Sequence, residues 1–128
     1  MNFSFSGLKT AVLYALEDLE EKDYPDVAAS FQEAVVDVLI KKLAYAIEQT
    51  GIKKLVCSGG VAANSLLRER LTDMGKTSEL EVSYPKMEFC TDNAAMIAYA
   101  GFIRKKYNLK EYPTKFARPR WPLGELYD

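Results

Sequence analysis

The sequence contains no histidine, which removes the commonest general base and metal ligand from the chain. A metal site built from this chain alone would need carboxylates or cysteines. The two cysteines, Cys57 and Cys90, do not form a CxxC pair. No signal peptide precedes them, so we expect two buried free thiols in a cytoplasmic protein.

An excess of positive charge is also missing, as are long apolar runs. Lys and Arg number 17 against 18 Asp and Glu, for a formal net charge of -1. That balance disfavours a protein that binds nucleic acid through bulk positive charge, but not one with a local basic patch. No run reaches the roughly 18 apolar residues that a membrane span needs. At 128 residues, with 48% hydrophobic and 27% charged residues, the chain is typical of one soluble globular domain.

Two helices are predicted in the first half of the chain. The first begins near Leu8, and Pro25 is expected to stop it. The second runs from residue 27 to about residue 50, with Asp26 as its N-cap and Gly51 as its C-cap. Its predicted buried stripe consists of Val27, Phe31, Val35, Val38, Leu39, Ala46 and Ile47.

The second half alternates strands and helices. Strands are predicted over residues 53–58 and 80–84, and a helix over 61–74 lies between them. A further helix over 93–107, capped by Thr91 or Asp92, is expected to point Met96, Ile97, Ala100 and Ile103 inward. The pattern predicts an α/β domain over residues 1–110 with a small sheet covered by helices, and an extended tail over 111–128. Two clear strands make a thin sheet for a self-sufficient domain.

Gly59 and Gly60 stand where the first predicted strand turns into a helix. Glycine there lets a ligand approach the backbone, and a helix N-terminus offers N–H groups to phosphate or sugar oxygens. Asn64 could point its amide at the same ligand. The alternative is a tight turn whose asparagine bonds local backbone, and the pattern alone leaves both interpretations open.

Asp92, in the run Cys-Thr-Asp-Asn, opens the last predicted helix. Local evidence favours a simple N-cap, which is worth about 1 kcal/mol. The functional alternative is a carboxylate at the end of a loop beside the glycine turn, where it could bind a metal or orient a substrate. A single carboxylate cannot make a metal site, so its partner ligands would come from outside the chain.

Two further segments carry polar groups. The run FSFSGLKT at residues 3–10 offers hydroxyls and a lysine to an anion, or the solvent face of an edge strand; without histidine, Ser6 or Thr10 is disfavoured as a nucleophile. Arg118, Arg120 and Trp121 form a basic and aromatic cluster of the kind that often contacts RNA. The equally weighted alternative is a tail held by its tryptophan.

Taken in order, four segments resemble one family. They are FSFSGLKT at 3–10, GGVAAN at 59–64 followed by Leu67-Arg68, CTDNAAMIA at 90–98 and ARPRWPL at 117–123. The family is the tRNA N6-adenosine threonylcarbamoyltransferases, long misnamed O-sialoglycoprotein endopeptidases or glycoproteases. Each segment alone is weak evidence, whereas the four together, in the family's order and spacing, are highly specific.

The resemblance implies an actin-like ATPase (RNase H-like) fold of two lobes around a nucleotide cleft. It implies transfer of threonylcarbamoyl from an adenylate to N6 of the adenosine next to the anticodon of ANN-decoding tRNAs. By position, Asp92 would be a ligand of an iron or zinc ion, together with two histidines of an HxxxH motif. Asn64, ending the GGVAAN motif, would contact the adenylate, and we expect Gly59 and Gly60 to lie beside it. Paralogous and ATPase partner proteins are implied for bacterial members.

The family's N-terminal half, which carries both histidines and the first glycine-rich loops, has no counterpart in this sequence. We therefore expect a fragment of the transferase that is inactive alone and does not bind metal specifically. Apolar surface left by the missing part predicts self-association. The alternative is a non-catalytic nucleotide-binding or scaffolding module. A metallopeptidase is disfavoured, because the sequence has no HExxH and no base able to activate water.

Overall fold

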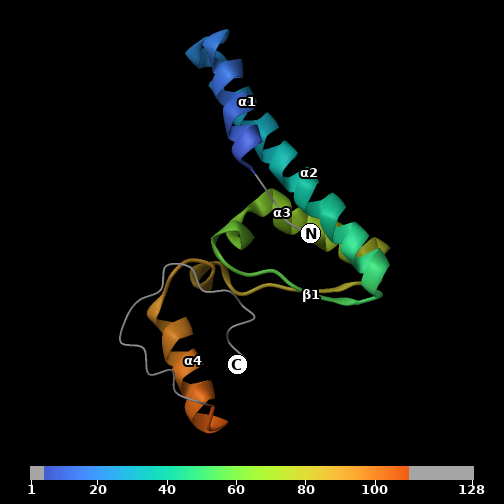
Figure 1. Cartoon of the computed structure of the whole chain (residues 1–128), viewed down its shortest axis with the longest axis vertical. Helices are drawn as coiled ribbons and strands as arrows, with labels where there is room; N and C mark the ends of the chain where they lie inside the picture. The colour runs from blue at the N-terminus through green and yellow to red at the C-terminus, as the bar shows by residue number, and fades with distance from the viewer. Residues whose placement is uncertain (1–4, 110–128) are drawn as a thin grey trace. The chain divides into compact units, whose positions relative to one another are not determined.

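The computed structural model describes residues 5–109, and it has helices and a small parallel sheet (Figure 1). This arrangement confirms the predicted α/β class. The chain divides into two compact units, Met1–Asp92 and Asn93–Asp128. The predicted boundary near residue 110 and the predicted tail over 111–128 lie at or outside the described residues and stay predictions.

Helix α1 spans Ser6–Glu17 and is followed by the 3-10 turn η1, Glu21–Asp23. Helix α2 then spans Tyr24–Thr50. Pro25 was predicted to stop the first helix, but it lies in the first turn of α2, where a missing N–H costs no hydrogen bond. For the same reason Asp26 is not the N-cap; it lies in the first turn, and Asp23 takes the cap position.

The predicted buried stripe of α2 is partly wrong. Val36, which the prediction omitted, is 3% exposed and is the one buried residue of α2, whereas Val38 is 40% exposed. Leu39, one of the predicted residues, is half-buried and packs against the core around Val36. The C-terminus agrees with expectation: Gly51 has a φ of 67° and its N–H donates to the carbonyl of Ile47 at 2.8 Å.

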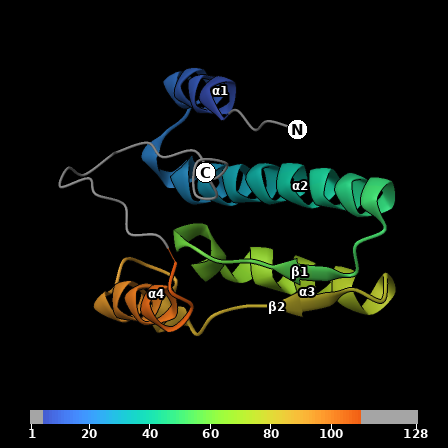
Figure 2. The ribbon, with the colours of Figure 1, turned by 60° about the horizontal axis from the view of Figure 1, so that its bottom comes forward.

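Strands β1, Lys54–Val56, and β2, Glu81–Ser83, form a two-stranded parallel sheet. Its register pairs Leu55 with Val82. Parallel strands need a crossover connection, and the 3-10 turn η2, Gly60–Ala63, and helix α3, Ser65–Thr77, supply it. Figure 2 shows the two strands side by side, with α2 running along them.

The core lies between one face of this sheet and the two helices α2 and α3. Val36, Leu67 and Leu71 are its buried centre, and half-buried Leu55 and Val82 pack against it from the strands. The opposite face of the sheet carries Val56, which is 73% exposed, together with the exposed side chains of Lys54, Glu81 and Ser83. Among the described residues, helices therefore cover only one face of the sheet.

Helix α4 spans Ala94–Lys106 in the second unit. It was predicted to point Met96, Ile97 and Ala100 inward, but all three are exposed, and only Ile103 of that set is half-buried. The prediction assumed that the apolar stripe of this helix packs against a hydrophobic core, but no residue of α4 is buried. Within residues 5–109, no helix combines the length and the apolar character needed to cross a membrane.

Candidate functional site

Gly59 and Gly60 join β1 to η2, as the glycine pair predicted. Gly59 has a φ of 89° and a ψ of 177°, a conformation essentially reserved for glycine. Both glycines are exposed, and a Cβ added to either would meet no atom within 4 Å. Backbone conformation therefore requires glycine at Gly59, and the backbone of the pair is open to approach.

Asn64 is the N-cap of α3, not a first-turn residue of a helix beginning at 61. Its Oδ1 accepts the Leu67 N–H at 2.9 Å, and its Nδ2 donates to Oε1 of Gln32 on α2 at 2.9 Å. The first contact is the local backbone bond that the alternative interpretation of this turn predicted. The Nδ2 amide has two N–H groups, so the second could still donate to a ligand.

A hollow of about 290 Å³ lies between α2 and the corner where η2 meets α3. Asn64 and Gln32 line it together with mostly apolar residues of α2. Small-molecule sites are commonly apolar hollows with a few polar groups that orient the ligand. Of the three residues predicted to bind nucleotide, Asn64 lines this hollow, whereas Gly59 and Gly60 do not.

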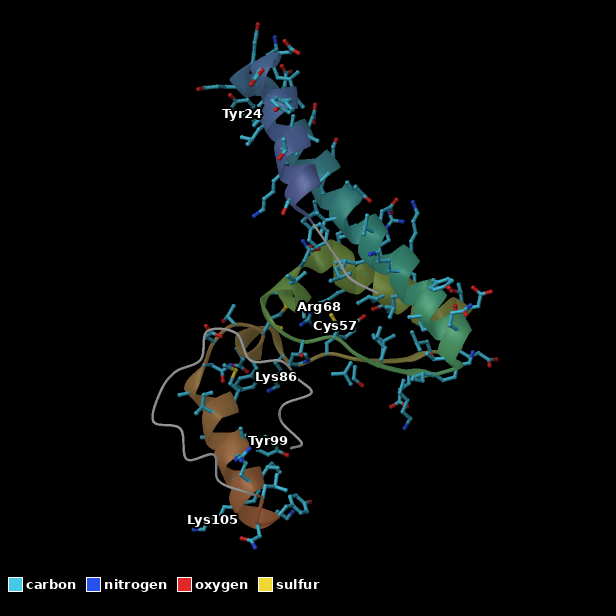
Figure 3. The ribbon with its side chains drawn as sticks, in the orientation of Figure 1. Tyr24, Cys57, Arg68, Lys86, Tyr99 and Lys105 are labelled. Carbon is cyan, nitrogen blue, oxygen red and sulfur yellow. The ribbon has the colours of Figure 1, made fainter. Side chains whose placement is uncertain are left out.

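Arg68 on α3 joins the glycine corner to the loop after β2 (Figure 3). Its Nε donates to the Ala62 carbonyl at 2.5 Å, and its Nη2 donates to the Pro85 carbonyl at 3.0 Å and to Sγ of Cys90 at 3.1 Å. Its guanidinium also lies 4.9 Å from the centre of the Tyr84 ring. Two of the segments singled out in the sequence, around Gly59–Asn64 and Cys90, are thus held by one side chain.

Both cysteines are free thiols, as expected, but the prediction that both are buried is correct only for Cys90, because Cys57 is half-buried. Burial raises the pKa of the Cys57 thiol above its ordinary 9.0, the positive charge of Arg68 opposes that rise, and Cys90 adds to it. A raised pKa keeps the thiol protonated at neutral pH, which makes it a poor nucleophile. Cys57 is therefore a structural group and not a candidate for nucleophilic catalysis.

Asp92 is exposed and lies two residues beyond the buried Cys90. The prediction that Thr91 or Asp92 caps the last helix is wrong. Asn93 is the N-cap of α4, and its Oδ1 accepts the Met96 N–H at 2.9 Å. Asn93 has the extended backbone and short acceptor side chain that a cap requires, so the capping role that local evidence assigned to Asp92 belongs to its neighbour.

The residues present do not fit a complete metal site. Within residues 5–109, no group of three or more His, Cys, Asp or Glu side chains could hold a metal ion. A transition metal in a protein needs several ligands in a defined geometry. The described residues, Asp92 among them, therefore do not complete such a site.

Arg68 and Gln32 are the site residues that sequence reasoning missed. Arg68 is part of a segment that resembles the family, but the residue pattern of α3 does not indicate that its side chain bonds Ala62, Pro85 and Cys90. Gln32 reads as an exposed polar residue of α2, and only the packing of α2 on α3 brings it to Asn64. Residues 3 and 4 of FSFSGLKT and the cluster of Arg118, Arg120 and Trp121 lie outside the described residues.

Comparison with known proteins extends these observations. Residues 1–99 match a family model described as tRNA N6-adenosine threonylcarbamoyltransferase. A curated tRNA N6-adenosine threonylcarbamoyltransferase of Methylobacillus flagellatus is 48% identical over 130 residues, which cover 98% of this chain. The same alignment covers 38% of that relative, so this chain spans well under half of its length.

Proposed function

The chain belongs to the tRNA N6-adenosine threonylcarbamoyltransferase family, and from that membership we propose that it is part of an enzyme of tRNA modification. The enzyme transfers threonylcarbamoyl from threonylcarbamoyl-adenylate to N6 of the adenosine next to the anticodon. The observation that carries this proposal is the similarity over 98% of the chain. tRNA and the adenylate are then its substrates, and paralogous and ATPase proteins are its partners in bacteria.

We propose that the first unit is part of a lobe of an actin-like ATPase fold. Its parallel strand pair with a helical crossover is a unit of which larger α/β sheets are built. The exposed face with Val56 supports this proposal, because parallel sheets are ordinarily covered on both faces. Further strands and helices would come from the rest of a protein as long as the relative.

Within that enzyme, Gly59, Gly60 and Asn64 contact the adenylate. The exposed glycine backbone offers room and N–H groups to the phosphate or sugar. The hollow beside Asn64 offers an apolar wall, and the second N–H of its amide offers a hydrogen bond. These features suit a planar base joined to a polar sugar and phosphate, which is the chemistry of an adenylate.

Asp92 contributes one ligand to an iron or zinc ion, and histidines outside this chain supply the others. The exposure of Asp92 supports this role, because its carboxylate can accept a partner without being pulled from a core. With one ligand, specific binding by this chain alone is not expected. The chain alone is therefore inactive in transfer.

The test is to mix this chain with the N-terminal portion that its relatives carry and to assay transfer of threonylcarbamoyl to tRNA. The mixture is expected to be active and each part alone inactive. Asp92→Ala should abolish the activity of the mixture and its bound metal. Glu88→Ala is the matched control, since Glu88 is an exposed carboxylate four residues earlier in the same loop. Undiminished activity and metal content with Asp92→Ala would contradict the assignment.

The second candidate is a nucleotide-binding or scaffolding module without chemistry. It is favoured by one observation: the Asn64 hollow is formed by this chain's own residues. Calorimetry of the chain with AMP separates the two candidates. Tight binding by the chain alone, combined with no activity in the mixture, would favour the module over the transferase.

A further inference from the structure

The side chain of Arg68 bonds three acceptors in two separate stretches of the first unit. Its acceptors are the Ala62 carbonyl in η2, the Pro85 carbonyl after β2, and Sγ of Cys90. Ala62 is 1% exposed and Cys90 is 3% exposed. Buried acceptors cannot turn to water when a donor is removed, so each would be left without that hydrogen bond. The guanidinium therefore fixes positions that solvent could not hold.

The Tyr84 ring, which the Arg68 guanidinium stacks on, is held in place as well. The Tyr84 hydroxyl donates to the Arg68 backbone carbonyl at 3.1 Å. It also lies 3.1 Å from the Thr72 hydroxyl, within hydrogen-bond distance. Tyr84 thus contacts Arg68 twice, through the guanidinium on its ring and through its hydroxyl on the backbone carbonyl. A planar fork on an aromatic face has a defined orientation, which the single ammonium of lysine cannot reproduce.

We propose that Arg68 is a positioning residue that locks the loop carrying Asp92 to the corner that carries Gly59, Gly60 and Asn64. Asp92 follows Cys90 by two residues, so its Cα can lie at most about 7 Å from that of the anchored cysteine. Movement of Cys90 therefore moves Asp92. The catalytic consequence of this lock rests on the proposed function, but the lock itself does not.

The chain contains its own reporter of the lock. Cys90 is buried beside Arg68, and Cys57 is a half-buried thiol on the sheet. We would measure the rates at which iodoacetamide modifies each cysteine in the native chain, resolved by peptide mass spectrometry. Iodoacetamide reaches a buried thiol only when the surrounding structure opens. A faster reaction at Cys90, which is 3% exposed, would therefore report opening of the loop.

Arg68→Met is expected to raise the Cys90 rate at least tenfold while the Cys57 rate does not rise. Arg68→Lys should give an intermediate Cys90 rate, because lysine keeps the charge but cannot bond all three acceptors. Arg70→Met is the matched control: Arg70 is on the same helix and pairs with Glu33 at 3.2 Å, so neither rate should change. A Cys90 rate in Arg68→Met equal to the native rate would overturn the proposal.

Global unfolding is distinguished by the two thiols, because it exposes both. If Arg68→Met raises both rates together, the comparison passes to Arg68→Lys. Selective exposure of Cys90 in Arg68→Lys supports the lock. Native protection of Cys90 in Arg68→Lys overturns it, since Arg68 would then not hold the loop. Loss of protection at both cysteines also overturns it, since Arg68 would then stabilise the whole unit and not this loop.

The catalytic consequence is tested in the mixture with the N-terminal portion. Displacing a catalytic group by about 1 Å can slow a reaction about a hundredfold, so Arg68→Lys should lower kcat at least tenfold with a KM for the adenylate within threefold of native. Equal kcat values would overturn the catalytic part. If the native mixture shows no transfer, the proposed function fails, and the thiol rates still decide whether Arg68 locks the loop.

Discussion

The amide of Asn64 faces two elements at once: its Oδ1 caps α3 through the Leu67 N–H, and its Nδ2 bonds Oε1 of Gln32 on α2, each at 2.9 Å. A cap needs only the oxygen. The nitrogen ties the start of α3 to α2 beside the hollow that both residues line. Asn64 therefore has a structural role and also lines the hollow, and substitution can separate the cap from the bond to Gln32.

Asn64→Ala should lower the free energy of unfolding by about 1–2 kcal/mol, because the cap and the bond to Gln32 are both lost. Asn64→Asp should lose much less, since aspartate keeps the cap oxygen and Gln32 can turn its amide to donate. Urea unfolding followed by circular dichroism measures both. Equal destabilisation by Ala and Asp would show that the cap oxygen is not the stabilising group.

Two valines of α2, one buried and one exposed, give a second pair of variants. Val36 is 3% exposed and Val38 is 40% exposed. Val36→Ala should cost about 2 kcal/mol of unfolding free energy, because it removes buried carbon and leaves a cavity. Val38→Ala should cost about 0.5 kcal/mol or less, as surface substitutions do. Thermal unfolding of both variants at equal concentration is the measurement. A larger loss of stability from Val38→Ala than from Val36→Ala would contradict the assignment of the buried face of α2.

Gly59→Ala and Gly60→Ala test the turn after β1. Gly59 has a φ of 89°, so a side chain there should cost about 1–3 kcal/mol through backbone strain. Gly60 begins η2 without a positive φ, and a Cβ there meets nothing within 4 Å. Gly60→Ala should therefore unfold at nearly the native urea concentration. Similar losses from both variants would argue against the conformation of Gly59.

The pKa of Cys57 gives a pH dependence with a definite sign. Burial raises this pKa above 9.0 in the folded chain, so the folded state holds the proton more tightly than the unfolded state. The associated stability is complete below the unfolded pKa and is lost as pH rises through the higher folded pKa. As the pH rises past 9.0, the native chain should lose more stability than Cys57→Ala. Parallel pH profiles from urea unfolding would refute this.

The exposed apolar side chains predict self-association of the isolated chain. Val56, on the outer face of the sheet, is 73% exposed. Exposed apolar surface of this kind favours association with another protein surface. Light scattering should show a mass that grows with concentration, and Val56→Lys should reduce that growth. Ser83→Lys, a charge added to an exposed polar position of the same sheet, is the control. A strictly monomeric native chain would contradict the expectation.

Residue periodicity and turn chemistry sufficed for the α/β class, for the C-terminus of α2 at Gly51, and for the glycine turn after β1. They failed where neighbouring residues compete for one role. Asp26 and Asp92 have good capping side chains, but the helices begin so that Asp23 and Asn93 take the cap positions. The buried face of α2 differs from the predicted one, because contacts with the sheet and α3 determine which side of this long helix is buried.

The site divides in the same way. Gly59, Gly60, Asn64 and Asp92 could be singled out because motif residues keep a fixed order along a sequence. Arg68 and Gln32 could not be assigned roles, because their contacts join residues distant in sequence and depend on how α2 and α3 pack. The metal role of Asp92, the actin-like lobe and the tail after residue 110 stay predictions.

The parallel pairing of Lys54 with Glu81 has a consequence for the order of folding. The helices form through contacts between neighbours in sequence, whereas the two strands can pair only after η2 and α3 have carried the chain back across them. Such non-local pairing is slow, because the loop must close before its contacts stabilise it. The strand amides should therefore be the last protected in pulsed hydrogen exchange. Arg68 bonds Ala62 inside the crossover and Pro85 beyond β2, and the second of these bonds can form only after that closure.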